Sequence, residues 1–190
     1  MPFYLMQGLA LDPSEAGLLL AVTSMSAIVS GPISGWLSDR FGSARFAALG
    51  ALLTTAAFAF MLDFDLYTPV TMIIPVLILL GLGVGTFQAP NNSVIMGAVP
   101  RERLGTASAL IATQRQVGIS LGLALAGTMF SARRLIHQEV LIREGLEKTY
   151  SATLSVSLAF HDVLLISIFL GILVVVLSLF SGEKRSLRAA

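Results

Sequence analysis

Long apolar stretches separated by short polar breaks make up most of this chain. Five stretches stand out, at about residues 16–37, 46–62, 70–98, 104–130 and 158–180. Each holds enough apolar residues to cross a hydrocarbon core that is about 30 Å thick. A chain in lipid must satisfy its backbone hydrogen bonds internally, which favours helices. The pattern therefore predicts a single all-α, polytopic membrane domain over residues 1–190 with five transmembrane helices.

The first eleven residues form a sixth apolar stretch that is too short to span a membrane. They carry no charge, so the basic n-region of a signal peptide is missing. Asp12, Pro13, Ser14 and Glu15 follow, and they are residues typical of a helix start. We expect residues 1–11 to be the end of a helix whose beginning is absent, giving five spans plus a partial N-terminal helix.

The polar breaks differ in length. Residues 39–45 and 100–103 are tight charged turns, whereas residues 133–157 form the only long polar segment. The apolar residues spaced along that segment predict an outer helix lying at the membrane interface. Residues 181–190 form a basic tail.

Positive charge is concentrated on alternate connections. One side carries an excess of Lys and Arg, namely Arg40, Arg45, Arg101, Arg103, Lys184, Arg185 and Arg188. The other side, which includes residues 12–15, 63–65 and 133–148, has an excess of acidic residues. Because short cytoplasmic loops are enriched in Lys and Arg, the two tight turns and the C-terminus are predicted to be cytoplasmic. The chain is thus expected to be multi-pass in the cell inner (plasma) membrane.

Composition supports the membrane assignment and excludes several functions. Only 12% of the 190 residues are charged, about half the fraction that is usual in soluble domains. The net charge of +1 gives no electrostatic case for a nucleic-acid partner. With no cysteine and two histidines, the sequence offers no metal-ligand or cofactor motif. The partners expected from composition are the lipid bilayer and whatever small molecules the membrane domain handles.

Small residues predict where helices approach one another closely. In the first span, Ser24, Gly31 and Ser38 recur every seven positions, with Ala27 and Gly35 beside them. The run from Gly81 to Gly85 lacks the lysine and the further glycine of a phosphate loop, so helix packing is the favoured interpretation.

A second glycine pattern resembles a catalytic motif. Gly118, Ser120 and Gly122 fit the Gly-x-Ser-x-Gly pattern of serine hydrolases. The two histidines, His137 and His161, lie at the outer side, far in depth from Ser120. We therefore favour small-residue packing and expect no catalytic residue and no enzyme activity.

Arg115 is the most informative single residue, because it lies inside the fourth span. It stands eleven positions after Leu104, or about 16 Å along a helix, near the middle of the membrane. An arginine at this depth is a candidate functional residue. Gln88 lies at a similar level, and Pro90 frees the carbonyl of Thr86. We expect Arg115 to bond to Gln88 or to that carbonyl, and a purely structural tie between two helices remains the alternative.

Three further polar residues, Gln88, Asn91 and Asn92, lie inside the third span. They are candidates for lining a substrate path, or they satisfy backbone groups freed near Pro90. At the outer end of the last span, His161 and Asp162 could titrate together. The preferred interpretation of that pair is an interfacial contact without a role.

The turn after the first span resembles a known family motif. Gly35-Trp-Leu-Ser-Asp39-Arg40-Phe-Gly42 is similar to the Gly-x-Leu-x-Asp-Arg-x-Gly loop of the major facilitator superfamily, although of its following basic residues only Arg45 is present. Three further segments resemble the C-terminal half of the fourteen-helix drug:proton antiporter branch, the EmrB/QacA type. They are residues 81–91, 99–109 and 114–122.

The resemblance implies a fold and an activity. The fold would be most of one six-helix half, with the N-terminal half missing. The activity would be proton-coupled efflux of hydrophobic or amphipathic drugs by alternating access, with a small-molecule substrate and protons as partners. Gly35, Asp39, Arg40, Gly42 and Arg45 would form a gating loop, in which Asp39 faces a helix N-terminus of the other half. The alternative is a truncated membrane protein that transports nothing unless a separate N-terminal half, or a second copy, completes it.

Overall fold

The structure is a computed structural model that describes residues 1–189, with side chains described for residues 1–180. The charges of the predicted basic tail at 181–190 lie outside these described side chains. Within the described residues the fold is all-helical and contains no strand, as the apolar pattern predicts. Five helices are long and apolar enough to cross a membrane.

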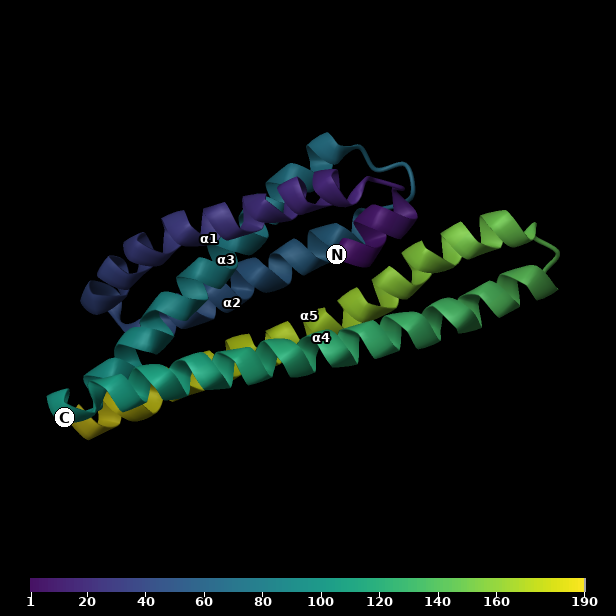
Figure 1. Cartoon of the computed structure of the whole chain (residues 1–190). Coiled ribbons are helices and arrows are strands. Elements are labelled where there is room, and N and C mark those ends of the chain that lie inside the picture. Colours follow the sequence, from purple (N-terminus) through teal and green to yellow (C-terminus); the bar gives the residue numbers. More distant parts are fainter. Residues whose placement is uncertain (190) are drawn as a thin grey trace.

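The five long helices run roughly along one direction (Figure 1). They are α1 (Pro13–Phe41), α2 (Ser43–Phe60), α3 (Val70–Gly97), α4 (Leu104–Arg143) and α5 (Lys148–Ala189). Short helical turns lie at Tyr4–Gly8, Met61–Asp63 and Arg101–Arg103. The α1–α2 turn, the start of α4 and the C-terminus gather at one end, which we call the inner end. The loop after α2 and the α4–α5 turn lie at the opposite, outer end.

Glycines on α3 seat this helix between α1 and α2. A Cβ atom added to Gly85 would lie 2.5 Å from the Ala27 carbonyl oxygen of α1, so only glycine fits this crossing. On another side of α3, a Cβ atom on Gly83 would lie 2.6 Å from the Thr54 nitrogen of α2. The glycine run of α3 therefore serves helix packing, as predicted.

The contacting face of α1 matches only part of the predicted stripe. The buried polar residues of α1 are Ser30, Ser34 and Ser38, whereas Ser24 is exposed and a Cβ atom on Gly31 would meet nothing within 4 Å. Of the predicted stripe, Ser38 is buried and Ala27 and Gly35 lie beside α3, whereas the buried serines recur every four positions. Serine hydroxyls on this face bond to backbone carbonyls, including Ser34 to Gly85 of α3 at 3.5 Å.

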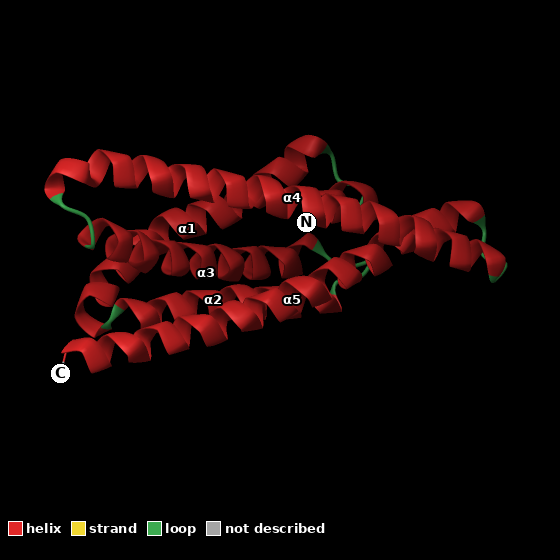
Figure 2. Ribbon diagram, turned by 90° about the horizontal axis from the view of Figure 1, so that it is seen from below, coloured by secondary structure: helices red, strands yellow, loops and turns green. Residues whose placement is uncertain are grey.

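Helices α4 and α5 form a V. They converge at the outer end and splay apart toward the inner end, with α5 beside α2 (Figure 2). Beyond the other helices they continue together as a projecting hairpin.

This hairpin corrects the prediction of a separate interfacial helix at 133–157. Residues 133–143 continue α4 and residues 148–157 begin α5. The reason is local, because no glycine or proline interrupts residues 128–144. The helix ends only where Gly145 adopts a φ of 89°, and its N–H donates to the carbonyl oxygen of Ile142 at 3.0 Å.

The largest apolar cluster lies at the outer end. Residues 1–11 are helical in part, as expected, and bury Tyr4 and Leu5 completely. The Tyr4 ring stacks on Phe160 of α5 with centroids 4.6 Å apart. Its hydroxyl donates to the Asp65 carbonyl at 2.5 Å and ties the segment to the loop after α2. The partial N-terminal helix is therefore part of the apolar core at this end of the bundle.

Candidate functional site

The polar residues of α3 lie toward its inner half. Pro90 is buried, Gln88 and Asn91 are half-buried, and Asn92 is exposed. α3 is helical throughout Val70–Gly97 although it contains two prolines. Among the described residues, the side chains of Gln88, Asn91 and Asn92 form no hydrogen bond with protein groups. They are therefore free to bind something other than this chain.

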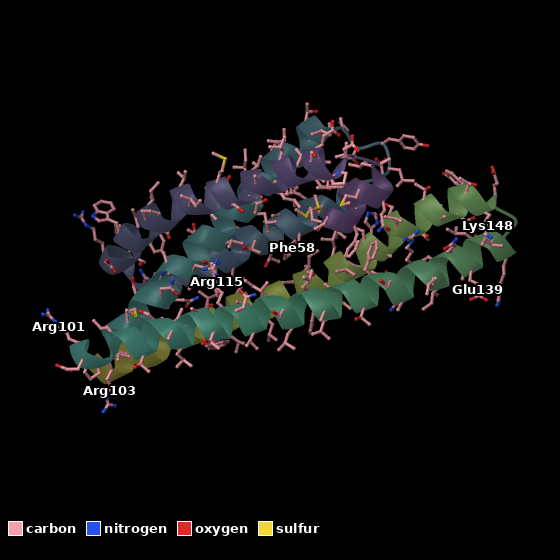
Figure 3. The ribbon with its side chains drawn as sticks, in the orientation of Figure 1. Phe58, Arg101, Arg103, Arg115, Glu139 and Lys148 are labelled. Carbon is pink, nitrogen blue, oxygen red and sulfur yellow. The ribbon has the colours of Figure 1, made fainter. Side chains whose placement is uncertain are left out.

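Arg115 projects from α4 toward the layer of α1, α2 and α3 (Figure 3). Its side chain is exposed, and within the described part of the chain it makes no hydrogen bond or ion pair. The expected bond to Gln88 or to the Thr86 carbonyl is thus not formed. The reason is the splay of α4, which contacts α3 only weakly.

One contact does join α4 to α3 near the inner end. The Ser108 hydroxyl lies 3.7 Å from the Met96 sulfur. Ser108 and Arg115 are two helical turns apart and therefore share one face of α4. This contact orients the Arg115 face toward α3 without closing the space between the two helices.

The glycines on α4 lie in the open. A Cβ atom on Gly118 or Gly122 would meet nothing within 4 Å, so the predicted small-residue packing has no partner among the described residues. Ser120 lies between them, within a continuous helix and with its side chain exposed. A nucleophilic serine of the Gly-x-Ser-x-Gly type needs a sharp strand-to-helix turn. The hydrolase interpretation therefore has no geometric support.

The predicted gating loop forms a one-residue turn between α1 and α2. Gly42 has a φ of 98°, and its N–H donates to the Ser38 carbonyl at 2.9 Å. This conformation favours glycine. Inside α1, a Cβ atom on Gly35 would lie 3.7 Å from the Ala89 Cβ of α3, an ordinary contact.

The charged side chains of this loop point outward. Arg40 lies over the Trp36 ring, 4.2 Å from its centroid. Asp39 and Arg45 are exposed, and Asp39 forms no ion pair in the described residues. Arg101 and Arg103 extend from the same end of the molecule. The turn thus presents a charged surface rather than a closed pocket.

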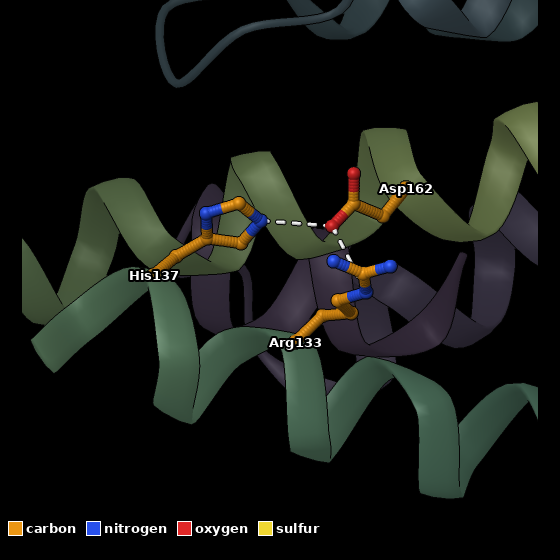
Figure 4. Close-up of polar contacts among 3 residues, drawn as sticks. All are labelled: Arg133, His137 and Asp162. Carbon is orange, nitrogen blue, oxygen red and sulfur yellow. Dashed lines mark hydrogen bonds and ion pairs between the residues drawn. The ribbon is translucent and has the colours of Figure 1, made fainter. Parts of the chain in front are cut away.

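A cluster that the sequence did not predict lies at the outer end. Asp162 of α5 contacts His137 and Arg133 of α4 (Figure 4), and we call these three residues the outer clasp. His161, which was expected to pair with Asp162, instead places its Nε2 atom 2.8 Å from the Phe64 carbonyl oxygen. Neighbouring residues on a helix point in different directions, which makes the predicted pairing wrong.

A usable signal was present in the sequence. Arg133 and His137 are four residues apart and share a helix face once α4 is known to continue past Phe130. The same extension carries the Glu139–Arg143 ion pair at 2.6 Å, which has the same four-residue spacing.

The loop after α2 is ordered by its own polar groups. Asp65 accepts hydrogen bonds from the Thr68 hydroxyl and from the Tyr67 N–H, both at 2.9 Å. These bonds, that from Thr68 foremost, lower the pKa of the Asp65 carboxyl group. Burial raises the pKa of Tyr4, which is bound to the same residue.

No group of three or more His, Cys, Asp or Glu residues is placed to hold a metal ion within the part of the chain that was described. The structure leaves two candidate sites. One is the polar surface formed by Gln88, Asn91 and Asn92 of α3 and Arg115 of α4, and the other is the outer clasp.

Comparison with known proteins gives one family. The family model of the Major Facilitator Superfamily matches residues 1–188. The chain is 39% identical over 132 residues to the uncharacterized transporter YebQ of Escherichia coli, a match covering 69% of this chain and 29% of that protein. It is 31% identical over 139 residues to the riboflavin transporter RibZ of Clostridioides difficile, covering 73% and 30%.

A third relative is the tetracenomycin C resistance and export protein of Streptomyces glaucescens. It is 34% identical over 132 residues, covering 69% of this chain and 24% of that protein. The matches thus cover less than a third of the length of each of these curated relatives.

Proposed function

Because the chain belongs to the major facilitator superfamily, we propose that it forms part of a transporter that exports hydrophobic or amphipathic small molecules in exchange for protons. The observation that carries the proposal is the unpaired Arg115 on an open face of α4, within the part of that helix that is long and apolar enough to span a membrane. A charge inside a membrane is costly and is typically retained for binding or translocation.

The arrangement of α3 and α4 supports a role as one wall of a path. Gln88 and Asn91 on α3 and Arg115 on α4 are polar groups without a protein partner in the described residues. In transporters of alternating access, substrate sites lie near the membrane midplane between two repeats. We propose that these three side chains face that path from one side.

Relatives support export without naming the substrate of this chain. One is named for riboflavin transport and another for tetracenomycin C resistance and export. Others carry names of multidrug resistance or efflux. We propose an organic small molecule as the class of substrate, and the EmrB/QacA-type branch as the origin of the chain.

We also propose an orientation. The inner end carries Arg40, Arg45, Arg101 and Arg103, so it would face the cytoplasm of a cell inner membrane. The exposed Asp39 would then be available to a helix N-terminus of another half, where a carboxylate is stabilised by about 0.3–1 kcal/mol.

A second candidate is a membrane protein that transports only together with a partner chain. Two observations favour it. The matches span less than a third of the relatives, and the glycine face of α4 has no partner within the described residues. A separate N-terminal half, or a second copy of the chain, would then supply the opposite wall.

Transport by reconstituted vesicles tests both candidates. The purified chain is placed in liposomes, alone and together with the N-terminal half of the E. coli relative, and proton-driven movement of a lipophilic dye is measured. Movement in either preparation supports export, and movement only with the added half supports the second candidate. Absence of movement in both preparations contradicts export.

Arg115→Leu should abolish any movement, whereas Val117→Leu, on the opposite face of α4, should preserve it.

A further inference from the structure

The outer clasp joins α4 to α5 through a single carboxylate oxygen. The Oδ2 atom of Asp162 lies 2.8 Å from Nε2 of His137 and 3.6 Å from Nε of Arg133 (Figure 4). Two basic side chains from one helix thus converge on one acidic side chain from the next helix.

The clasp lies at a position where it can control the separation of α4 and α5. It lies where α4 and α5 converge, and the two helices splay apart on the inner side of it. The side chains of His137 and Asp162 are about one-quarter exposed, at 27% and 26%. They are therefore shielded from full competition by water while remaining reachable by protons.

The neighbouring residue fixes α5 at the same level. His161 contacts the Phe64 carbonyl of the loop after α2. Asp162 is therefore presented to α4 from a helix that is held in place on its other side. A change at the clasp would move α4 rather than α5.

The chemistry of the three groups makes the contact sensitive to protons. A carboxylate only accepts hydrogen bonds, so Nε2 of His137 must carry the proton of this bond. Arg133 stays charged at all accessible pH values. When the imidazole takes up a second proton, the bond joins two opposite charges and becomes stronger.

Other charged or titratable groups at this end are already engaged or lie on other elements. Arg134 donates to Gln7 at 2.7 Å, and Glu139 pairs with Arg143. Further charged or titratable groups at this end include Asp63, Asp65, Tyr4, Tyr67, Glu144, Glu147, Lys148, Tyr150, His161 and the amino group of Met1. Among the described contacts, none of them bonds to His137 or Asp162.

We propose that His137 and Asp162 form a proton-binding site that clamps α4 against α5 when His137 is charged. Loss of the proton weakens the clamp and lets the outer part of α4 move away from α5. Proton binding at the clasp does not depend on transport by this chain. Its use as a step in proton-coupled export does rest on the proposed function.

The distance between the two helices tests the proposal directly. The chain contains no cysteine, so Leu135→Cys and Leu165→Cys introduce the only two thiols. Both side chains are exposed, at 67% and 56%, and they flank the clasp on α4 and α5. Spin labels at these positions in lipid nanodiscs report the separation at about pH 5 and about pH 8, the range over which imidazoles change charge. We expect a shorter and narrower distance distribution at the lower pH.

Matched variants assign the response. His137→Asn keeps a hydrogen-bond donor but cannot change charge, and Asp162→Asn removes the negative partner, so each should abolish the pH difference. His161→Gln removes the other histidine but keeps an N–H donor for the Phe64 carbonyl, so it should leave the difference intact. Each variant is first required to match the parent in helix content and elution volume.

Three results would overturn the proposal. They are an unchanged distance between the two pH values in the parent, a pH difference that survives His137→Asn, and a loss of the difference in His161→Gln as well. Because the measurement uses the isolated chain without substrate, its outcome is independent of the vesicle transport assay.

Discussion

Helices α3 and α4 both carry glycines, yet the two helices use them in opposite ways. On α3, Gly81, Gly83 and Gly85 sit against the backbone or side chains of α1 and α2, with no room for a Cβ atom. On α4, Gly118 and Gly122 meet nothing within 4 Å. Sequence spacing alone does not separate these cases, because both patterns are typical of close helix packing.

This difference shows which helix is packed by other helices of the same chain. α3 is buried by helices that this chain supplies, so its glycines stabilise the fold. α4 contacts mainly α5 and presents the Arg115 face to open space. We infer that the open face of α4 is the part that serves transport, and the following predictions can break or sharpen this contrast.

The largest effect is expected at α3. Gly85→Leu would force a side chain into the backbone of α1 near Ala27 and should lower the free energy of unfolding by about 3 kcal/mol or more. Thermal unfolding in detergent, followed by circular dichroism and gel filtration, measures the loss. Gly122→Leu on α4 is the matched control, and it should change the stability by less than about 0.5 kcal/mol. Equal losses of unfolding free energy in the two variants would contradict the contrast between the glycines of α3 and those of α4.

Arg115→Leu should separate stability from activity. Removing a charge from the middle of a span relieves about 2.5–3.5 kcal/mol of insertion cost, so the chain should be at least as stable as before. In the vesicle assay, a preparation that moves the dye with the parent chain should no longer move it with this variant. Loss of stability without loss of transport would show that Arg115 is a structural tie.

The turn at Gly42 should give an intermediate effect. Gly42→Ala places a Cβ atom at a φ of 98° and should cost about 1–3 kcal/mol of folding stability. Gly17→Ala is the control, since a Cβ atom on Gly17 meets nothing within 4 Å. Alanine favours helix by up to about 1 kcal/mol over glycine, so the control should be neutral or stabilising. A harmless Gly42→Ala would mean that another turn geometry is available.

The smallest effect is expected in the loop after α2. The folded chain holds the pKa of Asp65 below its usual value through the bonds from Thr68 and Tyr67. This contribution is present above the unfolded pKa of about 3.9 and is lost as the pH falls through the lower, folded pKa. Melting temperatures of the parent should therefore fall slightly below about pH 4. Asp65→Asn should reduce this decrease in melting temperature. An unchanged decrease would mean that other groups cause it.

Much of the architecture could be predicted from the sequence, because spans and turns depend on local composition. The five helices and the packing role of Gly81–Gly85 followed from apolar length and small residues. The full contacting face of α1 and the partner of Asp162 did not, since both depend on how neighbouring helices are rotated. The extension of α4 to Arg143 was missed because polarity suggested an interface helix, although nothing local ends the helix.

The candidate site was only partly predictable for the same reason. Arg115 was identified as a candidate from its depth in an apolar span, which is a property of one helix. Whether it meets Gln88 depends on the splay of α4 from α3, which the sequence does not encode locally. The outer clasp joins residues 25 positions apart, His137 and Asp162, on two long helices.

The central claim is that the Arg115 face of α4 lines an aqueous path. Single cysteines at Arg115 and Ala112 on that face, and at Leu121 on the opposite face, can be introduced into the cysteine-free chain. The decisive measurement is the rate at which a membrane-impermeant maleimide labels each cysteine. It is made in vesicles that also contain the N-terminal half of the E. coli relative. The account predicts clearly faster labelling at Arg115→Cys and Ala112→Cys than at Leu121→Cys. Equal rates at all three positions, or faster labelling at Leu121→Cys, would contradict it.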